Sequence, residues 1–221
     1  MGERIYTSAA GPWRVGATPL AFHFMTRFLL LILLVTACTD RARDLPPDRW
    51  RGAMLVNALP KPEVTLTATD GQPFDLRERT AGTVTLLFFG FTNCPDICPV
   101  HMANLGAVLR DYAPSLRQRI SVVFVTTDPA RDSLPRLREW LNNFDRDFIG
   151  LWGDAETVHR AQAALGLPPS ILGTPDSTGR YDVGHSAVVV AFTPDDSARF
   201  VYPFGIRQAD WANDLPQLLA W

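Results

Sequence analysis

The sequence predicts one α/β domain with a mixed central sheet, flanked by helices and preceded by an N-terminal β-hairpin. Continuous apolar runs at 84–91 and 120–126 are typical of strands buried on both faces of a sheet. Apolar residues at helical spacing follow each run, and a second hairpin and a helix are expected near the C-terminus. With 221 residues, 47% of them apolar, the chain is long enough for one such domain and a targeting segment.

The first elements of the domain are expected to be a hairpin, a buried strand and a helix. Residues 64–68 alternate like a half-exposed strand, and a turn at 70–71 precedes the short strand 74–76. After the first buried strand, a helix is expected over 99–112. Its apolar residues share one helical face; they are Met102, Leu105, Leu109 and Tyr112.

Two helices are expected after the second buried strand. One covers 134–144, with Asp132 or Ser133 as its N-cap. The other covers 155–165 and is capped by Asp154.

The last part of the chain is expected to hold a long loop, a hairpin and a helix. Residues 167–186 contain Pro, Gly and Ser throughout and show no clear period, which is typical of a loop that is either functional or disordered. Strands at 187–192 and 199–202 enclose a turn at 194–197, and a helix follows over 209–219. This order of elements is that of thioredoxin, so the predicted class is a thioredoxin-like fold.

The N-terminal part of the sequence predicts export and a lipid anchor. The apolar run 28–35 has eight residues, far fewer than the roughly 20 of a membrane-spanning helix, but after Arg27 it suits a signal peptide. The tetrapeptide 35–38, Val-Thr-Ala-Cys, resembles a bacterial lipobox, in which Cys38 is acylated and becomes the first residue. An ordinary short signal or an apolar anchor is the alternative.

These features divide the chain into four segments. Met25 is a natural start for the signal, so residues 1–24 are expected to lie upstream of the true start, with the signal peptide at 25–37. Residues 38–60 are polar and contain proline, as in a tether, and 61–221 form the domain. We therefore expect a protein of the bacterial cell envelope, lipid-anchored to a membrane, with its domain facing the periplasm or the outside.

Composition limits the function classes. The net charge is −2 and no block of Lys and Arg is present, which argues against a nucleic-acid partner. Apart from Cys38, the chain has two cysteines, Cys94 and Cys98. Two are too few for a disulfide framework, and a close pair is more often redox-active or metal-binding.

The cysteine pair is expected where a buried strand gives way to a helix. Unpaired backbone N–H groups and the helix dipole at such a place stabilise thiolates, which attack disulfides and bind metals. Three residues separate Cys94 from Cys98, whereas redox thioredoxins have two. At this spacing the sulfurs can share one face with an ion between them, although a disulfide is also possible. Two thiolates favour Cu(I) or Zn(II), and an added imidazole suits both oxidation states of copper.

Four histidines are available as a third ligand. His23 lies in or before the signal region, and His159 is expected on the solvated face of a helix. His101 would share a face with both cysteines if the helix began before Cys94, but the prolines at 95 and 99 favour a later start. His185 ends the long loop before a buried strand, which brings it beside the start of the first helix. We expect His185 to be the ligand and retain His101 as the alternative.

The motifs together resemble the Sco/SenC family. They are Gly90-Phe91-Thr92-x-Cys94-Pro95-Asp96-x-Cys98-Pro99, then Thr127-Asp128-Pro129-x-Arg131-Asp132, then His185-Ser186 before a strand. The resemblance implies a copper-binding metallochaperone that aids assembly of the binuclear copper centre of cytochrome c oxidase. It implies Cys94, Cys98 and His185 as the ligands, and the copper-centre subunit or another periplasmic copper protein as the partner. Asp128 and Arg131 are expected to shape a turn, with partner docking as the alternative.

One residue departs from the family pattern. An acidic residue usually precedes the ligand histidine, where this chain has Gly184. Its loss puts copper affinity, not ligand identity, in question.

Two other functions use the same thiols. A thiol-disulfide oxidoreductase that reduces the cysteines of a copper-site protein would need Cys94 and Cys98 but no imidazole ligand. A peroxidase of the peroxiredoxin type would use a single reactive cysteine and fits the pair poorly. The expectation is a binding protein rather than an enzyme.

Overall fold

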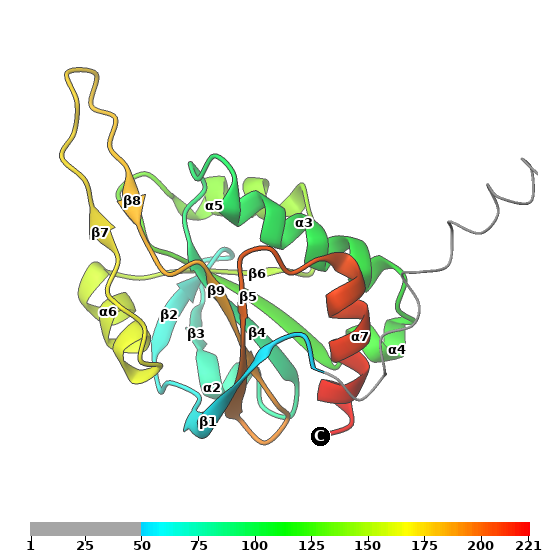
Figure 1. Ribbon diagram of the computed structural model, residues 1–221. Coiled ribbons are helices and arrows are strands. Elements are labelled where there is room, and N and C mark those ends of the chain that lie inside the picture. Colours follow the sequence, from blue (N-terminus) through cyan, green and yellow to red (C-terminus); the bar gives the residue numbers. More distant parts are fainter. Residues whose placement is uncertain (1–49) are drawn as a thin grey trace, which may run out of the picture. The chain divides into compact units, whose positions relative to one another are not determined.

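The computed structural model describes residues 50–221 (Figure 1). Contacts divide the chain into residues 1–47 and 48–221, and the account below concerns the second unit. The predicted start at Met25, the signal peptide, the acylated Cys38 and His23 lie outside the described residues. In the described part of the chain, no helix is both long and apolar enough to cross a membrane.

The domain is built on an eight-stranded sheet in the order β1-β10-β9-β4-β5-β6-β2-β3, with a separate two-stranded ladder, β7-β8. The strands are β1 (Ala53–Pro60), β2 (Thr65–Ala68), β3 (Pro73–Asp75), β4 (Val84–Gly90), β5 (Ile120–Thr126), β6 (Ile149–Trp152), β7 (Ile171–Leu172), β8 (Val183–Gly184), β9 (Val188–Phe192) and β10 (Ser197–Pro203). The helices are α2 (Leu76–Arg79), α3 (Ile97–Arg110), α4 (Pro114–Arg117), α5 (Leu134–Asn142), α6 (Ala155–Ala164) and α7 (Gln208–Leu219).

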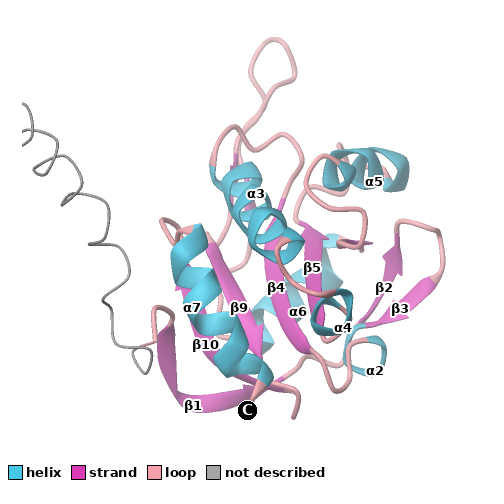
Figure 2. Cartoon of the chain, turned by 90° about the vertical axis from the view of Figure 1, so that its right-hand side faces the viewer, coloured by secondary structure: helices cyan, strands magenta, loops and turns pink. Residues whose placement is uncertain are grey.

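Helices cover both faces of the sheet (Figures 1 and 2). Strands β4, β5 and β6 run parallel, and β9 runs antiparallel to β4, so the central sheet is mixed. Apolar side chains of α3, α5 and α7 form the core on one face, and those of α6 and the β2–β3 hairpin form the core on the other. Because β4 is covered on both faces, all seven of its residues are buried.

The structure confirms the thioredoxin-like α/β class and the principal elements. Both buried strands, the N-terminal hairpin, the C-terminal hairpin and the helices α5, α6 and α7 lie where the sequence pattern predicts them, within a few residues. Ser133, not Asp132, caps α5, because its side chain accepts from the N–H of Arg136. Helix α3 begins at Ile97, two residues before the predicted start, with Asp96 as its N-cap.

The predicted tether is wrong at its C-terminal end. Residues 53–60 form β1, the edge strand that pairs with β10, instead of a polar linker. Half-buried Leu55 and Leu59 pack against the core while the other side chains are largely exposed, so the strand has little apolar signal of its own. Strand β6, the short helix α4 and the β7–β8 ladder were also not predicted.

Candidate metal centre

Two connections bring the cysteine pair and His185 to one end of the sheet. Strand β4 leads into the turn that carries Cys94, and Cys98 lies in the first turn of α3. Strand β8 ends directly before His185, and β9 then runs beside β4. Because β4 and β9 are antiparallel neighbours, the C-terminal end of β4 and the N-terminal end of β9 lie at the same end of the sheet.

The three side chains form a shielded set of donor atoms. The sulfurs of Cys94 and Cys98 and a ring nitrogen of His185 all lie within 4.8 Å of one another. Nε2 of His185 is 3.6 Å from Sγ of Cys98, and the backbone N–H of Cys98 points at Sγ of Cys94 at 3.4 Å. Within residues 50–221, no other group of three His, Cys, Asp or Glu side chains converges in this way.

A backbone hydrogen bond sets the orientation of the His185 ring. Nδ1 lies 3.0 Å from the carbonyl oxygen of Ser186, which can only accept, so Nδ1 carries the proton of the neutral ring. Nε2 therefore presents its lone pair towards Cys98. Phe88 and Phe91 hold the ring edge-on, with centroids 5.8 and 5.5 Å away. The nitrogen that can bind a metal is thus aimed at the sulfurs before any ion arrives.

The two thiols have opposite electrostatic environments. The hydrogen bond from the Cys98 thiol, together with the backbone N–H groups of Cys98 and Asp96, lowers the pKa of Cys94 to about 5, although burial opposes this. Burial raises the pKa of Cys98 far above its ordinary value, and the adjacent Cys94 sulfur adds to the effect. At neutral pH the pair is therefore one thiolate and one thiol, and a soft metal that binds both must displace the proton of Cys98.

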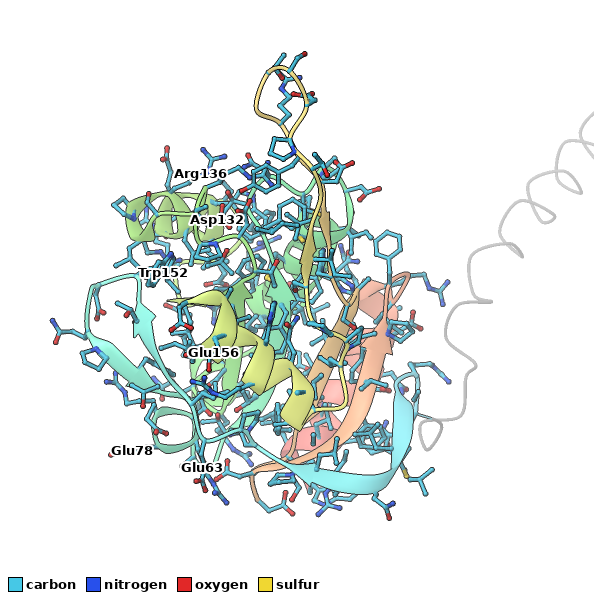
Figure 3. All side chains as sticks on the ribbon, turned by 90° about the vertical axis from the view of Figure 1, so that its left-hand side faces the viewer. Glu63, Glu78, Asp132, Arg136, Trp152 and Glu156 are labelled. Carbon is cyan, nitrogen blue, oxygen red and sulfur yellow. The ribbon has the colours of Figure 1, made fainter. Side chains whose placement is uncertain are left out.

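A buried carboxylate supports the turn before Cys94. Asp132 accepts hydrogen bonds from the N–H and hydroxyl of Thr92, at 2.9 and 2.5 Å, and from the hydroxyl of Thr126 at 2.6 Å. Arg136 reaches the same turn and donates to Thr92 Oγ1 at 2.8 Å and to Asn93 at 2.7 Å. Asp132 and Arg136 lie beside each other at the end of the sheet nearest the long loop (Figure 3). The sequence singled out Asp132 as a possible cap and as a motif residue but gave it no positioning role, so this role was missed.

A second polar group fastens the long loop that leads to His185. Arg131 forms an ion pair with buried Asp128, and its guanidinium lies 3.6 Å from the ring centre of Tyr181. The Tyr181 hydroxyl donates to Asp128 at 2.7 Å, and Arg131 donates to the Tyr181 carbonyl at 3.0 Å. Asp128 and Arg131 therefore do more than shape their own turn, because they tie the β7–β8 segment to the end of β5.

The other two described histidines lie outside the donor set. His101 is buried, with Nε2 3.3 Å from the carbonyl oxygen of Ala187 and its ring against Phe88. Because α3 begins after Cys94, the face that would have joined His101 to both cysteines does not form. His159 is half-buried, with Nε2 3.1 Å from the carbonyl oxygen of Ser170, so the prediction of a solvated side chain is wrong.

The family model of SCO1/SenC matches residues 56–220, which include all three motifs and the converging side chains. The chain belongs to the SCO1/SenC family. Among its relatives in this family, a protein of Stutzerimonas stutzeri that is named for copper binding is 32% identical over 193 residues, covering 86% of this chain and 93% of the relative. Mitochondrial SCO1 of Saccharomyces cerevisiae is 33% identical over 128 residues, 56% of this chain and 41% of that protein, so the chain spans less than half of its length.

Solved structures of SCO1/SenC proteins have the same fold. Yeast Sco1 with copper bound is 26% identical, with a TM-score of 0.65 over 73% of this chain and 88% of that one. ScoI of Bradyrhizobium japonicum with copper bound is 28% identical, with a TM-score of 0.61 over 71% and 97%.

Two glycines of this SCO1/SenC chain differ in what the structure requires of them. A Cβ at Gly90 would lie 2.9 Å from Sγ of Cys98, so glycine is needed for the close approach of β4 to the site. At Gly184, where the family usually has an acidic residue, the nearest atom to an added Cβ is the Ile171 carbonyl oxygen at 3.8 Å. The structure therefore has room for a side chain at Gly184.

Proposed function

We propose that this protein is a copper chaperone that binds its cargo through Cys94, Cys98 and His185 and delivers it to the binuclear copper centre of cytochrome c oxidase or another envelope copper protein. One observation carries the proposal: two sulfurs and one imidazole nitrogen, and no carboxylate, lie within 4.8 Å of one another. Such soft donors suit Cu(I), and the imidazole adds a ligand that Cu(II) also accepts. The copper-bound relatives are consistent with this assignment.

The site also fits release of the cargo. Cys98 is fully buried, whereas Cys94 is 9% exposed and His185 is half-buried, so two of the three ligands can be reached from outside. An incoming thiolate of a partner protein can replace Cys94 or His185 while Cys98 still holds the ion. Delivery then proceeds by ligand exchange, with no turnover chemistry required.

The proposal includes a place in the cell. The lipobox-like residues 35–38 favour acylation at Cys38, which would hold the domain on a bacterial membrane facing the periplasm or the outside. Mass spectrometry of the full chain from bacterial membranes is expected to find lipid on Cys38 as the first residue. An unmodified Cys38 would contradict this part of the proposal alone.

Copper analysis tests the binding function. Residues 48–221, purified reduced and loaded with Cu(I), are expected to retain about one ion per chain against a Cu(I) chelator, as a single site requires. Cys94→Ala and Cys98→Ala should each lose it, while His159→Ala, a histidine bonded only to a loop carbonyl, should not. Equal retention by both cysteine variants would overturn the proposal.

A thiol-disulfide reductase is the second candidate, and the lowered pKa of Cys94 favours it. In that reaction the Cys94 thiolate attacks a substrate disulfide and expels one substrate thiolate. The Cys98 thiol then loses its proton and attacks Cys94, which releases the second substrate thiolate and leaves a Cys94–Cys98 disulfide. This function needs no imidazole ligand, so reductase activity that survives in His185→Ala while Cu(II) binding is lost and Cu(I) binding is weakened would separate the two roles.

A further inference from the structure

The exposed apolar side chains of the domain gather at its two ends. In the described part of the chain, the large apolar residues with the most exposure are Met54, Val56, Val100, Leu116, Ile171, Leu172, Phe204 and Trp221. One half of this set surrounds the metal centre: Phe204 contacts His101, Val100 precedes it on α3, and β7 pairs with β8 before His185. A partner protein that docks to exchange copper would cover these residues, so the proposed function explains their exposure.

The other half, Met54, Val56, Leu116 and Trp221, lies at the opposite end. We call these four residues and the half-buried Trp50 the base. Met54 pairs with Phe200, whose ring contacts Trp50 and Trp221 at 4.2 and 5.9 Å. Figures 1 and 2 both show β1 and the C-terminal end of α7 at the lower end of the domain, away from the β7–β8 loop. The copper function gives these residues no role.

Trp50 and Met54 of the base lie on the α7 face of the sheet. Met54 of β1 lies opposite Phe200, whose side chain belongs to the α7-side core, so Met54 also points to the α7 side. Trp50 packs against the core on that same side. At the edge of the sheet the base is uncovered: Val56 is 99% exposed, Met54 59% and Trp221 50%. Several large apolar residues this exposed at one end of a domain indicate an interaction surface.

Arginines border the same face. Arg199 lies over the Trp221 ring at 4.8 Å, and Arg119 donates to the Leu219 carbonyl at the end of α7. Arg119 also follows α4, which carries Leu116. Arg199 is also paired with Asp195. The acidic Glu63 and Glu78 lie at this end too, but on the side of α2 and the β2–β3 hairpin (Figure 3).

We infer that the base is a membrane-docking face, which seats the domain on the lipid surface and points the metal centre away from it. This rests on the proposed acylation of Cys38. The described chain begins at Trp50, inside the base, and the 12 residues from Cys38 to Arg49 span at most about 40 Å when extended. The tether from Cys38 therefore enters the domain through the base, at the end opposite the metal centre. Tryptophan, aliphatic side chains and arginine are the residues that favour the interface between headgroups and acyl chains.

Tryptophan quenching tests the orientation. The lipidated full chain is reconstituted in vesicles of phosphatidylethanolamine and phosphatidylglycerol with brominated acyl chains, which quench an indole only at close range. Trp221, measured as the difference between the parent and Trp221→Phe, is expected to be quenched. The indole introduced by Leu172→Trp, at the metal end, is expected to stay unquenched. Quenching at the metal end, or none at Trp221, would overturn the inference.

A matched pair of surface variants tests which residues bind the lipid surface. The double variant Met54→Asp, Val56→Asp should lower the ratio of docked to undocked protein about tenfold, because two exposed apolar side chains are lost. The quenching of Trp221 should fall with it. Ile171→Asp with Leu172→Asp at the metal end should change it little. Both pairs are exposed, and unchanged Cu(I) binding in the Met54 and Val56 pair would show that the domain is intact.

Two outcomes separate this inference from the proposed anchor. If mass spectrometry finds no lipid on Cys38, residues 48–221 joined at their N-terminus to a synthetic lipid repeat the quenching experiment, and an unquenched Trp221 then refutes the docking face itself. If a second copy of the chain covers the base, sedimentation will show concentration-dependent dimers that Val56→Asp abolishes, and Trp221 will remain unquenched. That result would also overturn the inference.

Discussion

The metal end and the opposite end of the domain each contain a buried charged side chain that joins separate segments. At the metal end, Asp132 accepts from Thr92 and Thr126 and so fixes the turn before Cys94. At the opposite end, Lys61 follows β1 and donates to Thr80, Thr85 and Asp196, at 2.8, 3.0 and 2.6 Å. These bonds hold the segment between β1 and β2 to β4 and to the β9–β10 turn. The first network touches the segment that carries a ligand, and the second touches none. We therefore expect loss of Asp132 to affect both stability and copper binding, and loss of Lys61 to affect stability alone.

The largest effect expected at the metal end is from oxidation. A disulfide between Cys94 and Cys98 removes both thiolates, so the oxidised protein should bind no Cu(I), whereas the reduced protein binds it. The measurement is Cu(I) retention after mild oxidation, with the disulfide identified by mass. Stoichiometric Cu(I) on the oxidised form would show that the sulfurs are not the ligands.

The next largest effect is expected from replacing the histidine that binds copper. His185→Ala should abolish the sulfur-to-copper charge-transfer absorption of the Cu(II) form, because the nitrogen that accompanies the thiolates is lost, while Cu(I) is bound more weakly. His101→Ala should keep the band, since its Nε2 is engaged with the Ala187 carbonyl at 3.3 Å. The reverse pattern would mean that α3 rearranges when copper binds.

A third experiment compares the two charged networks directly. Asp132→Asn and Lys61→Met should each lower the free energy of unfolding by about 3 kcal/mol, because each leaves buried polar partners unpaired. Only Asp132→Asn should also weaken Cu(I) binding, by about tenfold, as expected for a residue that orients a ligand segment. Equal copper affinities in the two variants, measured by chelator competition, would remove the distinction between the ends.

The sequence predicted the metal end better than the base, for a physical reason. Motif residues and two strands buried on both faces give strong local signals, so the cysteine turn and the approach to His185 were placed correctly. Strand β1 owes its structure to pairing with β10, about 140 residues away, and exposes most of its side chains. Neither the hydrophobic periodicity nor the composition of residues 53–60 indicates that they pair with β10. Asp132 was missed as a positioning residue because its bonds to Thr92 and Thr126 depend on how two strand ends meet.

A pH experiment tests the electrostatics of the pair in reduced, metal-free protein. With the pKa of Cys94 at about 5, its thiolate predominates above that pH, so its alkylation by iodoacetamide should be nearly constant between about pH 6 and 8 and fall below pH 5. Cys98, whose pKa is raised by burial, should react slowly throughout. Cys98→Ala removes the first cause of the lowered pKa and should make the Cys94 rate rise with pH across this range. Equal profiles for the parent and Cys98→Ala would refute the hydrogen bond as the cause.

The smallest effect is expected at Gly184, where the metal end departs from the family pattern. Gly184→Asp fits sterically, since the nearest atom to an added Cβ is 3.8 Å away, and a carboxylate beside His185 should make the imidazole a stronger donor. The gain in Cu(II) affinity should be no more than about tenfold, because Nδ1 is already bonded to the Ser186 carbonyl. Gly184→Asn is the matched control, similar in size but without charge. If both variants gain equally, the effect comes from restricting the loop backbone; if neither gains, the Ser186 carbonyl already orients the ring as well as a carboxylate would.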